Sequence, residues 1–97
     1  MILQTFIQDM EAGQGFHLPG RVMRMGSLLG RIFAGREEDL NKEVQVSYKR
    51  TSGGHGYSFH CSYLWTVKGV NLPLSMVEDM PGVFPTREGF GCGWGWY

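Results

Sequence analysis

The sequence predicts a small α+β domain. We expect an antiparallel sheet made of a hairpin over residues 44–50 and 57–67 and a C-terminal strand over 89–96, with one helix near 21–34 packed on one face. Alternation of polarity with period two in the hairpin and the C-terminal segment predicts the strands. A separate apolar stripe in 20–35 predicts the helix. An all-β barrel or sandwich is the alternative, and either fold would make 1–97 a single domain.

The hairpin has the clearest pattern in the chain. Every odd position of 57–67 is apolar or aromatic, and the even positions of 44–50 begin with Val, Val and Tyr. Between the two runs, residues 51–56 contain three glycines, which favours a turn. A register with Tyr48 opposite Tyr57 keeps the apolar side chains on one face, as a half-buried sheet requires.

The last residues alternate as well. Phe90, Cys92, Trp94 and Trp96 share one parity and glycines fill the other, so a strand over 89–96 would have one aromatic face and one bare face. Glycine in a strand often marks the close approach of another backbone or a ligand.

Residues 20–35 fit two structures. As a helix, Val22, Met25 and Leu29 form one stripe and the arginines another. Against the helix, Gly26 and Gly30 each cost about 1 kcal/mol in a helix interior. The rival is a hairpin turning at Gly26 and Ser27. We prefer the helix.

Composition narrows the classes of function. The formal net charge is zero, so bulk electrostatics gives no general attraction to nucleic acid or to an anionic membrane. No apolar run approaches the roughly 20 residues of a membrane span, and the first residues lack the basic region of a secretory signal. We therefore expect no membrane association, a cytoplasmic location and reduced thiols.

Catalytic and metal-binding patterns are weak. The thiols are Cys61 and Cys92, and the only close pair of potential ligands is His60 with Cys61. Adjacent residues on a strand point to opposite faces, so this pair cannot easily chelate one ion or form a nucleophile with its base. We expect no enzyme, no cofactor and no metal; a small enzyme or metal site that uses Cys61 or Cys92 with a histidine is an alternative.

Binding of another protein is the predicted function. Tryptophan, tyrosine and arginine are enriched among the residues that dominate interfaces. The candidate partner-binding residues are Arg21, Arg24, Arg31, Trp94, Trp96 and Tyr97. The expected partner is another protein or protein complex, or a second copy of this chain.

The predicted mode of action is steric inhibition of a larger host enzyme or nucleoprotein. Small single-domain inhibitors are common among products of phages and mobile elements, including anti-CRISPR proteins, so we expect a protein of that type. The alternative is a domain that binds single-stranded nucleic acid, with Arg21, Arg24 and Arg31 on the phosphates and the C-terminal aromatic rings stacked on bases.

Overall fold

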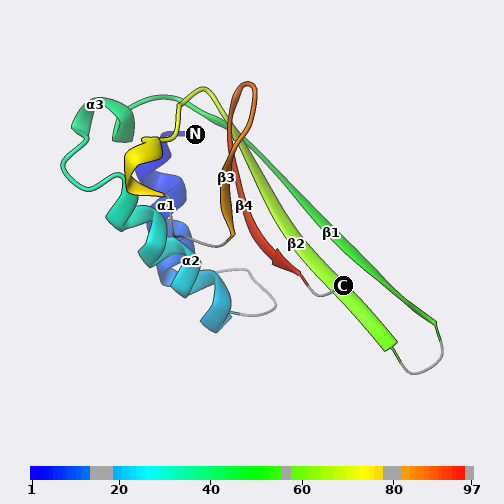
Figure 1. Cartoon of the computed structure of the whole chain (residues 1–97). Helices are drawn as coiled ribbons and strands as arrows, with labels where there is room; N and C mark the ends of the chain where they lie inside the picture. The colour runs from blue at the N-terminus through cyan, green and yellow to red at the C-terminus, as the bar shows by residue number, and fades with distance from the viewer. Residues whose placement is uncertain (14–18, 56–57, 78–81, 96–97) are drawn as a thin grey trace.

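The fold is a four-stranded antiparallel sheet with helices against one of its faces (Figure 1). The structure is a computed structural model that describes residues 1–13, 19–55, 58–77 and 82–95, without the side chains of 19, 51–55, 58–62 and 95. In chain order the elements are α1 (Leu3–Ala12), α2 (Pro19–Ile32), α3 (Glu37–Leu40), β1 (Gln45–His55), β2 (Ser58–Lys68), the 3-10 helix η1 (Leu74–Met76), β3 (Val83–Pro85) and β4 (Gly89–Gly95). The strand order β1-β2-β4-β3 confirms an α+β fold with a small open sheet and rules out the barrel.

The predicted hairpin is present, but the predicted pairing register is wrong. Tyr48 pairs with Trp65 instead of Tyr57, and β1 continues through the glycine-containing segment to His55, which pairs with Ser58. The reason is that glycine and serine tolerate extended backbone as well as turns, so residues 51–55 join the strand. The shift covers eight residues, an even number, and therefore leaves each side chain on its predicted face.

The C-terminal strand is confirmed as β4, which pairs with β2. Phe90 lies opposite Val67, and Cys92 lies opposite Trp65. These side chains share what we call the inner face of the sheet, the face that the helices cover. The predicted last residue, Trp96, is outside the described residues.

Residues 19–32 form a helix, not the rival hairpin, and the interior glycine Gly26 is part of the reason. A Cβ atom added at Gly26 would lie 2.8 Å from the carbonyl carbon of Met10 and 2.9 Å from its Cβ, so α1 crosses α2 directly above this residue. Tertiary packing therefore offsets the low helix propensity of glycine. The rest of the inward side of α2 carries buried apolar residues, among them Val22 and Leu29.

The second long helix is α1; in the sequence, residues 2–8 allow a strand or the start of a helix, and Ile2, Leu3, Phe6 and Ile7 fit a helical stripe better than alternation. Leu3, Phe6, Ile7 and Met10 are buried at helical spacing. The helix ends at Gly13, whose φ of 65° is the left-handed conformation that glycine adopts without strain.

The core lies between the two long helices and the inner face of the sheet. The rings of Phe33, just after α2, and Phe90, on β4, are 5.7 Å apart and both side chains are fully buried. The other buried members come from both long helices and from the strands, and include Leu3, Met10, Leu29, Ile32, Trp65, Val67 and Val83. This cluster fixes the helices on one end of the sheet.

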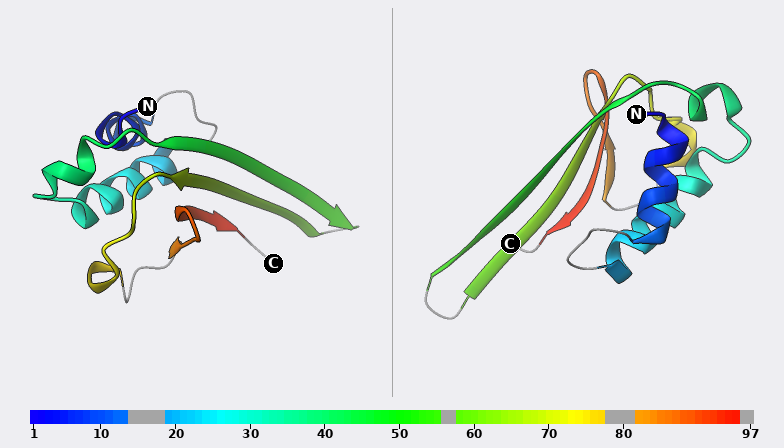
Figure 2. Two further views of the ribbon diagram at one scale, coloured as in Figure 1. Left: turned by 90° about the horizontal axis from the view of Figure 1, so that it is seen from above. Right: turned by 180° about the vertical axis from the view of Figure 1, so that it is seen from behind.

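The hairpin extends beyond that core. β4 ends beside Ser62 of β2, which pairs with Thr51, so the paired residues beyond this point form a two-stranded projection that we call the arm (residues 51–55 and 58–62). Figures 1 and 2 show the two strands running past the ends of the helices. The molecule accordingly measures 48 Å along its longest axis and 26 and 22 Å across the others.

Candidate functional site

Four aromatic rings and one arginine gather on the inner face where the arm begins. Ring centroids are 5.0 Å apart for Tyr48 and Trp65, 5.3 Å for Trp65 and Trp94, and 4.9 Å for Trp94 and Tyr63. The guanidinium carbon of Arg50 lies 5.5 Å from the centroid of the Tyr63 ring, within the range of a cation–π contact. We call these five residues the arm-base cluster.

Strand pairing is what assembles this cluster. Tyr48 pairs with Trp65 and Arg50 with Tyr63 across β1 and β2, and Tyr63 pairs with Trp94 across β2 and β4. Paired residues of antiparallel strands project to the same side, about 5 Å apart, so their side chains meet on the inner face. Three strands thus supply one continuous aromatic surface.

Burial decreases across the cluster toward β1. Trp65 is 2% exposed and Tyr63 is 6% exposed, whereas Tyr48 is 47% exposed. The same change occurs along β1, from buried Val44 through half-buried Val46 to Tyr48, because the helices cover only the first part of the strand. Tyr48 is therefore an exposed aromatic residue on a rigid, buried aromatic base.

The indole of Trp94 adds an unmet donor. Within the described part of the chain, its Nε1 atom is buried and donates no hydrogen bond. A buried donor without an acceptor costs about 1–3 kcal/mol.

The predicted arginines lie on a different side of the molecule. Arg21, Arg24 and Arg31 are all exposed on α2. Arg24 and Arg31 are two turns apart on the side of the helix opposite Leu29, which packs into the core. The structure therefore does not bring these two arginines together with Trp94, which belongs to the inner face of the sheet. Trp96 and Tyr97 lie outside the described residues.

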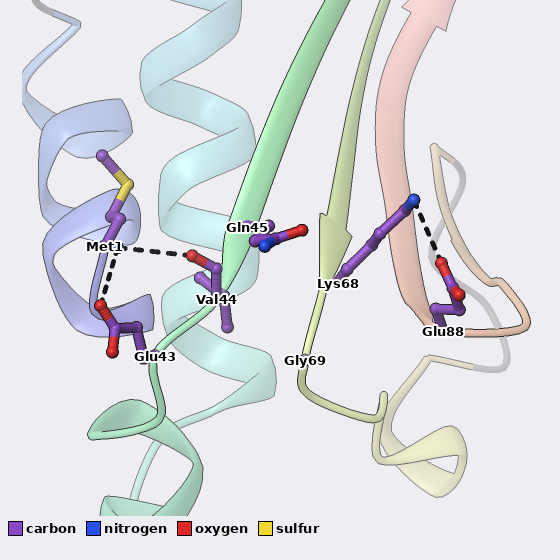
Figure 3. A pocket seen from close by; sticks show the side chains of 7 residues that line it. All are labelled: Met1, Glu43, Val44, Gln45, Lys68, Gly69 and Glu88. Atoms are coloured by element: carbon purple, nitrogen blue, oxygen red, sulfur yellow. Dashed lines mark hydrogen bonds and ion pairs between the residues drawn. The ribbon is translucent and has the colours of Figure 1, made fainter.

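A shallow hollow of about 670 Å³ opens at the other end of the hairpin, where β1 begins and β2 ends (Figure 3). Its charged groups are already paired: Lys68 Nζ lies 3.1 Å from Glu88 Oε2, and the terminal nitrogen of Met1 lies 3.8 Å from Glu43 Oε1. The remaining lining residues are Val44, Gln45 and Gly69. With two acids beside two cations, this hollow favours neither an anionic nor a cationic ligand.

The described residues form neither a candidate metal site nor a reactive thiol. They contain no group of three or more histidine, cysteine or acidic side chains placed to hold a metal ion. Cys92 is fully buried on β4, and burial raises the pKa of its thiol to about 12. The side chains of Cys61, His17, His55 and His60 are outside the described set.

Cys92 should therefore resist thiol reagents in the folded protein. In a Cys61→Ser background at pH 8, we expect iodoacetamide to modify Cys92 only at the rate at which the protein unfolds, because the thiolate is the reactive form. The folded pKa is above that of the unfolded chain, so this group favours folding below pH 9, and the contribution is lost between pH 9 and about 12. Mass spectrometry of timed samples measures the modification. Fast labelling without denaturant would contradict the buried placement.

Sequence patterns alone did not single out most of the arm-base cluster. They place Tyr48, Tyr63 and Trp65 on the apolar face of the hairpin, which is correct, but they treat that face as core along its whole length. The signal that distinguishes Tyr48 is its distance from the helices, and this depends on the register and on how far α1 and α2 reach. Only Trp94 was both predicted as a binding residue and found in the cluster.

The fold and this surface together define a class: a small α+β protein with a projecting β-hairpin arm and an aromatic–arginine surface at the base of the arm. Searches of protein-family models, of curated proteins and of solved structures each found no match. None of the described helices has both the length and the apolar character needed to cross a membrane.

Proposed function

We propose that this protein binds another protein through the arm-base cluster and the arm that extends from it. The observation that carries the proposal is the position of Tyr48, which is 47% exposed although its ring lies 5.0 Å from the buried ring of Trp65. Tyrosine, tryptophan and arginine dominate the energetics of protein interfaces because they combine a large apolar area with a polar group. All three residue types meet here.

The rigidity of the base supports this proposal. Binding costs free energy when side chains must be ordered at the interface. Trp65 and Tyr63 are already held by their cross-strand partners and by burial, so a ligand that contacts Tyr48 meets a surface with little side-chain freedom left to lose. Preorganisation of this kind favours affinity.

A nucleic-acid ligand fits the cluster less well. Stacking of bases requires exposed ring faces. Trp65 and Tyr63 are almost fully buried and Trp94 is half-buried, so Tyr48 is the one described ring of the cluster with a large exposed area. Arg24 and Arg31, two of the arginines predicted to contact phosphates, lie on the side of α2 that faces away from this surface.

We further propose that the effect on the partner is steric. A projecting two-stranded arm attached to a compact helical base occupies the partner's surface and excludes other ligands from it. The experiment below tests binding first; a competition assay with the partner's own ligand then tests exclusion.

Tyr48→Ala should abolish or strongly weaken partner binding without unfolding the protein. Truncation of an interface anchor commonly costs 2 kcal/mol or more, so we expect at least about a tenfold loss of affinity. The measurement is affinity capture of the partner from a lysate of the source organism with immobilised protein, followed by calorimetry with the purified partner.

Phe84→Ala is the matched control. Phe84 is 43% exposed, nearly as much as Tyr48, but it pairs with Gly91 and belongs to the outer face of the sheet. We expect it to retain the partner. Equal binding by wild type and Tyr48→Ala, or capture that nuclease treatment removes, would refute the proposal.

A further inference from the structure

The outer edge of β1 has a geometry that accepts another strand. Among the strands that the structure describes, β1 is the last on its side of the sheet, with β2 as its neighbour on the other side. At its base the chain already adds a short antiparallel segment to this edge: Val44 N donates to Met1 O at 2.7 Å, and Leu3 N donates to Lys42 O at 3.0 Å. Ile2 and Glu43 form the corresponding antiparallel bridge.

The direction of the backbone groups can be followed along the strand. Gly69 N donates to Glu88 O, which shows that the odd residues of β2 bond toward β4 and its even residues toward β1. Through the β1–β2 register, the odd residues of β1 then bond to β2 and the even residues turn toward the outer edge. Val44, an even residue, turns this way and bonds to Met1. Val46 and the even residues beyond it continue the same row.

Beyond Glu43 at its base, the described part of β1 carries positively charged side chains. Lys49 and Arg50 are exposed at the middle of β1, on the outer and inner faces respectively. The sequence has no aspartate or glutamate from Val44 to Val70. Inner-face neighbours Val46 and Tyr48 add apolar area next to the positive charge. An added strand with acidic side chains on one face and apolar side chains on the other would match both surfaces.

We propose that β1 binds an extended acidic segment of the partner protein by antiparallel strand addition along its outer edge. In this mode main-chain hydrogen bonds supply much of the affinity and alternate side chains supply the specificity. The inference rests on the proposed function, since it states how the protein binds its partner and what chemistry the partner presents.

A second copy of the chain fits this edge less well than an acidic segment. Two β1 strands that overlap near residues 48–50 would place Lys49 and Arg50 of one copy beside those of the other. Like charges at opposing positions destabilise a sheet, and β1 carries no carboxylate to compensate. The arrangement of charge therefore favours a partner of opposite sign over self-association.

The test uses the purified full chain and two synthetic octapeptides, one alternating valine with glutamate and one alternating valine with lysine. Both have the same strand propensity and opposite charge. We expect the glutamate peptide to bind, with NMR shift changes concentrated on β1 and cross-strand Hα–Hα contacts from the peptide to Ser47 or Lys49. We expect the lysine peptide to give no such contacts.

Charge reversal on the edge supplies the second readout. Lys49→Glu should lower the affinity for the glutamate peptide about tenfold and raise the affinity for the lysine peptide. The affinities of Lys49→Gln should lie between those of wild type and Lys49→Glu. Arg24→Glu, the same charge change on the exposed side of α2, should bind the glutamate peptide as wild type does. Circular dichroism of each variant establishes that it is folded.

Four results would overturn the inference: neither peptide binds, both bind equally, Lys49→Glu behaves as wild type, or the contacts lie on α2. Sedimentation that shows a dimer held through β1 would assign the edge to a second copy and would overturn it as well. The peptide experiment tests strand addition and the Tyr48→Ala experiment tests the proposed function, so either can fail without the other. Partner capture that depends on Tyr48 but not on Lys49 leaves the proposed function standing and removes strand addition.

Discussion

Phe90→Ala is expected to lower the free energy of unfolding by about 3–5 kcal/mol. Phe90 is fully buried on β4, and its ring lies 5.7 Å from that of Phe33, next to α2. The substitution therefore empties space at the point where the helices meet the sheet, and the loss combines reduced apolar burial with the cavity left behind. Because total stabilities are about 5–15 kcal/mol, this is a large fraction of the whole.

Urea unfolding followed by tryptophan fluorescence and by far-UV circular dichroism measures this loss. Phe84→Ala is the control on the same sheet, since its ring is 43% exposed on the outer face. We expect it to cost less than about 1.5 kcal/mol, in proportion to the smaller area that it buries. Equal losses at the two positions would contradict the assignment of the inner face as the core.

Gly26→Ala is expected to destabilise the protein by about 2 kcal/mol, although alanine is the better helix former by about 1 kcal/mol. The added Cβ would lie 2.8 Å from the carbonyl carbon of Met10 and 2.9 Å from its Cβ. Both neighbours belong to α1, and one is backbone. The helices must therefore separate to admit the methyl group, and the overpacking cost exceeds the gain in propensity.

Two other glycines of α2 provide matched controls for thermal or urea unfolding. A Cβ at Gly20 meets nothing within 4 Å, so Gly20→Ala should leave stability unchanged or raise it by up to about 1 kcal/mol. A Cβ at Gly30 would meet Glu11 Oε1 at 2.8 Å, the far end of a flexible, exposed side chain that can turn away. We expect Gly30→Ala to be close to neutral. A stabilising Gly26→Ala would show that α1 does not cross α2 at this residue.

The glycines of α2 illustrate a general difference between local and tertiary information. From the sequence, Gly26 and Gly30 are only unfavourable residues in a helix, and they make the helix and the hairpin at 20–35 hard to separate. In the structure Gly26 is the contact with α1, so the same residue that weakens the isolated helix permits its packing. The value of a small residue at a crossing depends on what crosses there, and one segment's pattern does not contain that information.

The sequence by itself determined the faces of this protein. Period-two alternation placed Val46, Tyr48, Trp65, Phe90 and Trp94 on one side of a sheet, and that assignment survives an eight-residue error in register because the side-chain period of a strand is two. It likewise determined which side of α2 is apolar, because helical period is a property of the local chain.

Only the tertiary structure decided how far the helices reach along those faces and therefore which apolar residues are exposed. Trp65 and Tyr48 are cross-strand neighbours with the same pattern, yet one is 2% exposed and the other 47%. The difference arises because Trp65 lies on the interior strand β2, between the rings of Tyr48 and Trp94, whereas Tyr48 lies on the edge strand β1. The order of the strands depends on contacts between residues distant in the chain, and the candidate surface exists where the buried rings meet this edge.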